Sequence, residues 1–133
     1  MTYVLWAVQI LLGLGFLASG AMKLTQPYEV LASQMAWVGD VPPRLVLFIG
    51  LAEVLGALGL IIPAATRISP WLTPLAAAAL ALVMLLATLF HLARGELTMA
   101  PIPLVFGLLA LFVAYGRRTL APIRPRAPTA AGA

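Results

Sequence analysis

Four long apolar runs dominate the hydrophobic pattern of the chain, and short polar stretches separate them. The runs cover about residues 3–22, 45–62, 71–92 and 101–116. An α-helix needs about 20 apolar residues to cross a bilayer, and these Leu- and Ala-rich runs lack the alternation of transmembrane barrel strands. The pattern predicts an all-α membrane protein, a four-transmembrane-helix bundle, in which Pro63 ends the second span.

The stretch 25–43 between the first two runs is less apolar. Its apolar and polar residues fall on different helical faces. The apolar face has Tyr28, Leu31, Met35 and Val38, and the polar face has Glu29 and Ser33. We expect either a short amphipathic helix in the membrane interface or a partly re-entrant segment.

The composition requires lipid as the solvent for most of the surface. The 133 residues are 63% hydrophobic and 9% charged, whereas soluble chains carry about 25% charged residues. The absence of cysteine excludes disulfides, thiol redox chemistry and cysteine-ligated clusters within this chain. One histidine without a carboxylate cluster predicts no metal site. No Lys/Arg stripe is interleaved with aromatics, so we expect no nucleic-acid partner.

The charges predict how the chain lies in the membrane. Four spans place both termini on one side, and that side gathers five arginines: Arg67, Arg117, Arg118, Arg124 and Arg126. Cytoplasmic loops are enriched in Lys and Arg, so we expect an inner-membrane protein with cytoplasmic N- and C-termini. Residues 1–118 form the predicted transmembrane domain, and residues 119–133 a disordered, basic and Pro-rich tail.

Glu53 is the first candidate for chemistry, because it lies nine residues inside Arg44, or about 14 Å along a helix. A carboxylate at such depth usually marks a ligand site or a proton path, although it can also simply pin helices together. Lys23 and His91 are its candidate partners, and the sequence leaves open which of them it reaches. Lys23 alone fits a snorkelling lysine, and His91 alone fits an interfacial residue. Gln9, Ser19 and Thr88 share the polar faces of their helices and complete the candidate ligand-binding or proton-relay set.

Three motifs carry a family resemblance. They are the run Ser19-Gly20-Ala21-Met22-Lys23-Leu24, the Gly- and Leu-rich segment 50–63 around Glu53, and His91 with Arg94-Gly95-Glu96. In this order the chain resembles the DoxX-like family of small four-helix membrane proteins, up to about Arg118. The resemblance implies a four-transmembrane bundle with motif positions at Lys23, Glu53 and His91. Some relatives are subunits of thiosulfate:quinone oxidoreductases, and others are membrane anchors or assembly factors.

The residues and the resemblance together predict a redox-associated, quinone-linked membrane subunit with an interior polar site. Quinone is the expected cofactor, and partner redox enzymes would supply the electrons, since no redox centre is visible in the sequence. Whether the chain itself is catalytic stays open. One alternative is a non-enzymatic membrane anchor or assembly factor whose arginine-rich tail recruits proteins. Another is a transporter or channel for protons or a small solute, in which a homo-oligomer completes the pathway.

Overall fold

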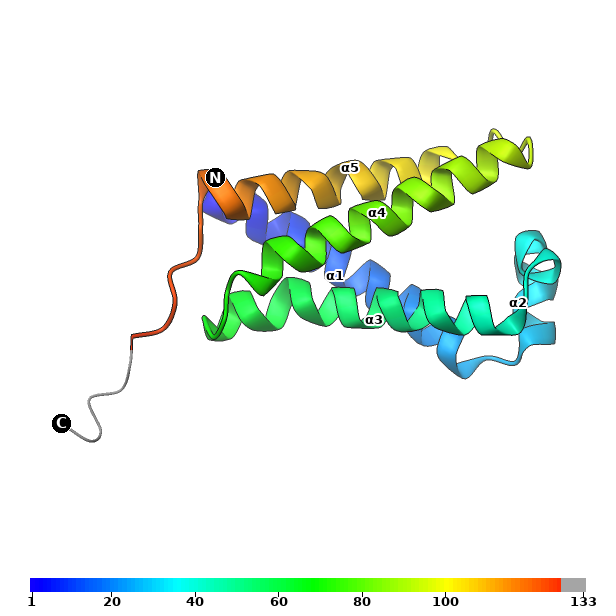
Figure 1. The fold of residues 1–133 in the computed structure, drawn as a ribbon, viewed down its shortest axis with the longest axis horizontal. Helices are drawn as coiled ribbons and strands as arrows, with labels where there is room; N and C mark the ends of the chain where they lie inside the picture. The colour runs from blue at the N-terminus through cyan, green and yellow to red at the C-terminus, as the bar shows by residue number, and fades with distance from the viewer. Residues whose placement is uncertain (128–133) are drawn as a thin grey trace.

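A computed structural model describes residues 1–127, and these residues are helical with short connections (Figure 1). Four helical segments, 2–25, 43–66, 72–93 and 101–120, are long and apolar enough to cross a membrane. The predicted multi-pass, four-helix membrane fold is therefore confirmed. The elements in chain order are α1 (Thr2–Thr25), α2 (Tyr28–Gln34), the 3₁₀ helix η1 (Ala36–Asp40), α3 (Pro43–Thr66), α4 (Leu72–Ala93), α5 (Pro101–Tyr115) and the π-helical turn η2 (Gly116–Leu120).

The four long helices form two pairs, α1 with α3 and α4 with α5. The pairs meet near the end of the bundle that holds the N-terminus and diverge toward the other end (Figure 1). Gly20 lets α1 approach α3 closely, because a Cβ on Gly20 would lie 2.6 Å from the carbonyl oxygen of Gly50. Small residues are the usual means of close helix contact in lipid, where no hydrophobic force draws helices together.

The prediction that Pro63 ends the second span is wrong. Helix α3 continues to Thr66 and ends at Arg67, whose φ of 58° is left-handed. Proline lacks an N–H, so the carbonyl of Gly59, four residues earlier, loses its helical donor. The Thr73 hydroxyl, on the first turn of α4, donates to that oxygen at 3.2 Å. A neighbouring helix thus satisfies the freed carbonyl, which is how membrane helices tolerate proline.

The segment between α1 and α3 folds across the end of the bundle away from the termini (Figure 1). It contains the expected short helix, α2, followed by η1. Leu31, Val38 and Val46 form a small core of their own there. The Tyr28 hydroxyl lies 2.8 Å from the carbonyl oxygen of Val38 and 2.9 Å from that of Val41, so its hydrogen is shared between them. These contacts give the segment a defined shape.

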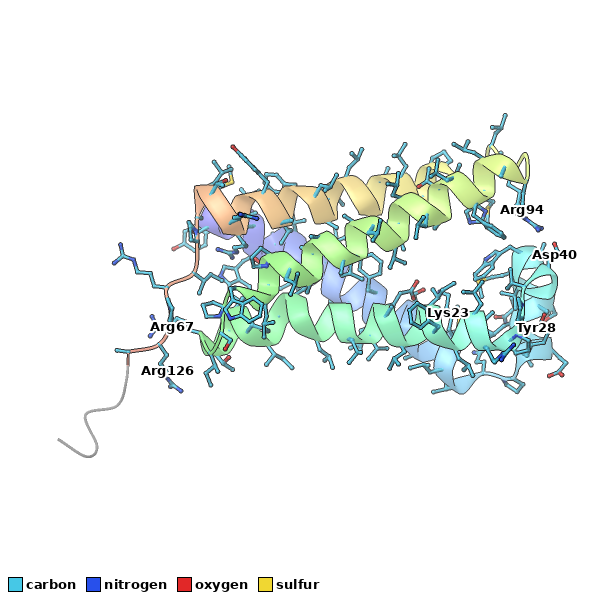
Figure 2. The ribbon with its side chains drawn as sticks, in the orientation of Figure 1. Lys23, Tyr28, Asp40, Arg67, Arg94 and Arg126 are labelled. Atoms are coloured by element: carbon cyan, nitrogen blue, oxygen red, sulfur yellow. The ribbon has the colours of Figure 1, made fainter. Side chains whose placement is uncertain are left out.

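The last helix extends through η2 to Leu120, so Arg117 lies within helical structure. Residues 122–127 have no regular secondary structure. The backbone N–H of Arg126 donates to the carbonyl of Arg67 at 2.8 Å, which brings this stretch beside the α3–α4 turn (Figure 2). Residues 128–133, the end of the predicted tail, lie outside the described residues.

Candidate functional site

Lys23 and Glu53 form an ion pair between α1 and α3. The Lys23 Nζ lies 3.1 Å from Oε2 and 3.3 Å from Oε1 of Glu53, and it also donates to Ser19 Oγ at 2.6 Å. Only 6% of Lys23 and 4% of Glu53 are exposed. A buried charge is strongly unfavourable unless it is paired and hydrogen-bonded, and each residue provides what the other needs. The partner of Glu53 is therefore Lys23 and not His91.

Gly50 makes room for this pair. A Cβ on Gly50 would lie 2.8 Å from the Cβ of Lys23, so the lysine stem passes over a position where any larger residue would displace it. An ammonium group has three N–H donors. Three acceptors lie within reach of these donors: the two oxygens of Glu53 and Ser19 Oγ.

A cavity of about 430 Å³ lies between the two helix pairs. Its walls are mostly aliphatic and aromatic, with rings from Phe16, Trp37, Phe48, Phe90 and Phe106. The hydroxyl and ionisable groups in the lining are Ser19, Lys23, Glu53 and His91. Ligand pockets typically have volumes of about 300–1,000 Å³ and combine apolar walls with a few polar groups. The cavity fits that description.

His91 lines the same cavity but is held by a second network near its rim. Its Nδ1 lies 3.1 Å from Glu96 Oε2. The other carboxylate oxygen of Glu96 accepts from Arg94 Nε, and Arg94 Nη1 lies 2.6 Å from Asp40 Oδ2. The hydrogen bond from Arg94 lowers the pKa of Glu96, and Glu96 and then Asp40 raise the pKa of Arg94. Because Nδ1 of His91 faces Glu96, Nε2 is the ring nitrogen left for a ligand.

Comparison with protein families matched residues 7–113 to the DoxX-like family. The chain belongs to the DoxX-like family. The matched region contains both partners of the buried ion pair and the histidine on the opposite wall of the cavity. Searches of curated proteins and of solved structures gave no match.

Gln9, one of the predicted site residues, lies away from the cavity in this DoxX-like bundle. Its Nε2 donates to the carbonyl of Leu60 at 2.7 Å, and its Oε1 accepts from Arg117 Nε at 2.5 Å. Arg117 also donates to the carbonyl of Ala121 at 3.2 Å and stacks over the Trp6 ring at 5.3 Å. Gln9 and Arg117 are both buried. They join α1 to the last helix and form a structural contact at the terminal end.

Sequence reasoning missed Arg117, although a signal was present. The small-residue face of the last span runs through Gly107, Ala110 and Ala114, and Arg117 continues its spacing of three and four residues. Residues at such spacing share one helical face. Extending the face by one turn would have placed this arginine inside the bundle.

Thr88 also lies outside the cavity. Its hydroxyl donates to the carbonyl of Met84 in its own helix at 2.7 Å, and it borders a separate groove between α4 and α5. Of the six predicted site residues, the structure therefore brings four to one cavity: Ser19, Lys23, Glu53 and His91. Within residues 1–127 no three His, Asp or Glu side chains gather as metal ligands would.

Proposed function

We propose that this DoxX-like protein is a redox-associated membrane subunit that binds a quinone in the cavity beside Lys23 and Glu53. One observation carries the proposal: an apolar space of about 430 Å³ has a buried ion pair on one wall and a histidine on another. A quinone is a flat apolar ring with two carbonyl oxygens, so it needs both kinds of surface. With cytoplasmic termini, as the arginine distribution predicts, the cavity faces the outer leaflet.

The residues in the cavity fit such a ring. Lys23 lines the cavity and could share one of its donors with a carbonyl oxygen, and His91 has Nε2 for a second polar contact. Aromatic side chains such as Phe16, Trp37 and Phe106 would contact the ring faces, an arrangement in which offset or edge-to-face contacts are favourable. A bound quinone would carry electrons and protons between membrane enzymes. The electrons would come from a partner oxidoreductase.

The role of the chain's own residues is to orient the ring and to hold protons. Glu53 pairs with Lys23 and holds its side chain at the cavity wall. Glu96 beside Nδ1 orients the His91 ring, so that Nε2 is the nitrogen left for a ligand. Both residues are suited to general acid–base work at a quinone oxygen.

Trp37 provides a direct test, because it lines the cavity whereas Trp6 and Trp71 do not. In a Trp6→Phe/Trp71→Phe background, we expect a short-chain quinone to quench Trp37 fluorescence in a saturable manner. Lys23→Met/Glu53→Gln should weaken binding about tenfold or more, since it removes a charge-assisted hydrogen bond worth about 1.5–3 kcal/mol. The matched control is Glu29→Gln, at an exposed carboxylate on α2.

The double substitution is chosen so that no buried charge is left unpaired. Native mass spectrometry of gently purified protein gives an independent readout, because a bound quinone would be seen with wild type and lost with the double variant. Absence of both saturable quenching and co-purified quinone from folded wild-type protein would overturn the proposal. The anchor, assembly-factor and transporter alternatives would then be the ones to pursue.

A further inference from the structure

Contacts between α4 and the segment over the bundle end cross one end of the cavity. Arg94, at the end of α4, reaches Asp40 in η1 with 2.6 Å between Nη1 and Oδ2. Beneath this pair, the rings of Trp37 and Phe90 meet edge to face at 6.1 Å, and the Arg94 guanidinium stacks over Phe90 at 5.4 Å. Figure 2 shows Asp40 and Arg94 facing each other from the two diverging helix pairs. We call these four residues, Trp37, Asp40, Phe90 and Arg94, the latch.

The latch lies at the mouth of the cavity. Trp37 and Phe90 are cavity-lining residues themselves, and so are Met35 and Val41 on either side of η1. A water-borne molecule entering from this end would have to separate η1 from α4. The contacts that resist this separation are side-chain contacts between two segments that belong to different helix pairs.

The flank of the cavity is built differently. Phe48 on α3 and Leu86 on α4 both line the cavity, yet they are 66% and 58% exposed. Residues that touch both the cavity and the outer surface mark a place where the two are continuous. Both side chains are apolar and lie on membrane-spanning helices, so this opening faces lipid.

We infer that the Asp40–Arg94 latch shuts the cavity to water while the α3–α4 flank admits molecules dissolved in the bilayer. The ligand class is therefore a membrane-soluble apolar molecule with a compact polar head. Only the identification of that molecule as a quinone rests on the proposed function. The latch is also readily opened: Asp40 is 60% exposed and Arg94 26%, and exposed ion pairs contribute little to stability.

The absence of cysteine from the whole sequence makes the two routes separately measurable. A single thiol from Ala87→Cys, in the cavity lining on α4, would be labelled in nanodiscs, where both membrane faces are accessible. One reagent is a charged methanethiosulfonate and the other an apolar maleimide that partitions into lipid. Leu55→Cys, on the exposed surface of α3 and outside the cavity lining, reports how fast each reagent reacts in lipid itself.

We expect the apolar reagent to label the Ala87→Cys thiol at a rate similar to the Leu55→Cys thiol, and the charged reagent to label it slowly. Asp40→Asn should raise charged labelling about two- to fivefold, the change expected from losing an exposed ion pair, and leave apolar labelling unchanged. Asp40→Glu should restore slow labelling. Glu29→Gln, which removes an exposed carboxylate from the same segment, should have no effect.

Charged labelling that is as fast in wild type as in Asp40→Asn would overturn the latch. Apolar labelling that is far slower at Ala87→Cys than at Leu55→Cys would overturn the lateral route. Addition of a short-chain quinone separates this inference from the proposed function. If the quinone protects the thiol from labelling, both the quinone site and the access route are supported. If Asp40→Asn raises charged labelling but the quinone gives no protection, quinone binding is contradicted and the access route is kept.

Discussion

At the end of the bundle that holds the N-terminus, Arg117 is buried against a neutral amide, whereas at the other end Lys23 is buried against a carboxylate. The helices around Arg117 are packed, and its Nη2 is buried without a hydrogen-bond partner among the described residues. The helices around Lys23 diverge and leave a cavity. The end with the N-terminus thus buries the net positive charge of Arg117 in a packed core. At the other end, the charges of Lys23 and Glu53 neutralise each other beside the cavity.

Burial alone therefore does not identify a functional site. Gln9 and Arg117 are as deeply buried as Lys23 and Glu53, and their hydrogen bonds go to each other and to backbone carbonyls. What distinguishes Lys23 and Glu53 is that they line the cavity. Substitutions at the terminal end should therefore change stability alone, and those at the cavity end should change both stability and ligand binding.

The largest effect is expected from breaking the cavity pair on one side only. Lys23→Met leaves the Glu53 carboxylate buried without its cation, and loss of one partner of a buried pair costs about 3–5 kcal/mol. Lys23→Met/Glu53→Gln should recover most of this loss. Chemical unfolding in detergent would measure it, and a double variant no more stable than Lys23→Met would show that the pairing does not govern stability.

A smaller loss should follow Gln9→Leu at the terminal end. The change removes the acceptor for Arg117 Nε, and hydrogen bonds to charged groups are worth about 1.5–3 kcal/mol. Quinone quenching of Trp37 should not change, because Gln9 is outside the cavity lining. If Gln9→Leu weakened quenching by the quinone and left the free energy of unfolding unchanged, the terminal end would be assigned to ligand binding and not to stability.

The smallest effect is expected when a lower pH protonates Glu96 near the rim of the cavity. The hydrogen bond from Arg94 lowers the pKa of Glu96 below its ordinary value of 4.5. A depressed folded-state pKa means that this contact contributes stability above pH 4.5 and loses it as the pH falls through the lower value. Glu96 faces Arg94 and His91, and Arg94 in turn faces Asp40.

An Asp40→Asn background isolates Glu96 from the other rim carboxylate. Trp37 emission in the single-tryptophan variant, followed from about pH 6 to about pH 3, should shift as Glu96 gains its proton. Adding Glu96→Gln should remove the shift. A shift of equal size in both variants would assign it to another group.

Hydrophobic periodicity was enough to predict the four spans and the short helix after the first of them, because membrane helices must satisfy their backbone internally. It also indicated that Glu53 would be interior. It did not reveal the end of α3, since the hydroxyl that compensates for Pro63 comes from Thr73 on another helix. The sequence likewise left both Lys23 and His91 as candidate partners of Glu53. The partner is Lys23, because α1 and α3 approach each other closely at Gly20 and Gly50.

The bond from Thr73 to Gly59 has a mechanical consequence. It joins α3 and α4 near the end where the helix pairs meet, at the first turn of α4. The remaining 20 residues of α4 extend about 30 Å beyond it. A rotation of α4 by about 5° about this contact would move its far end by almost 3 Å, as far as the 2.6 Å between Arg94 Nη1 and Asp40 Oδ2. A small rotation of α4 about this contact would therefore be enough to separate Arg94 from Asp40 at the other end of the bundle.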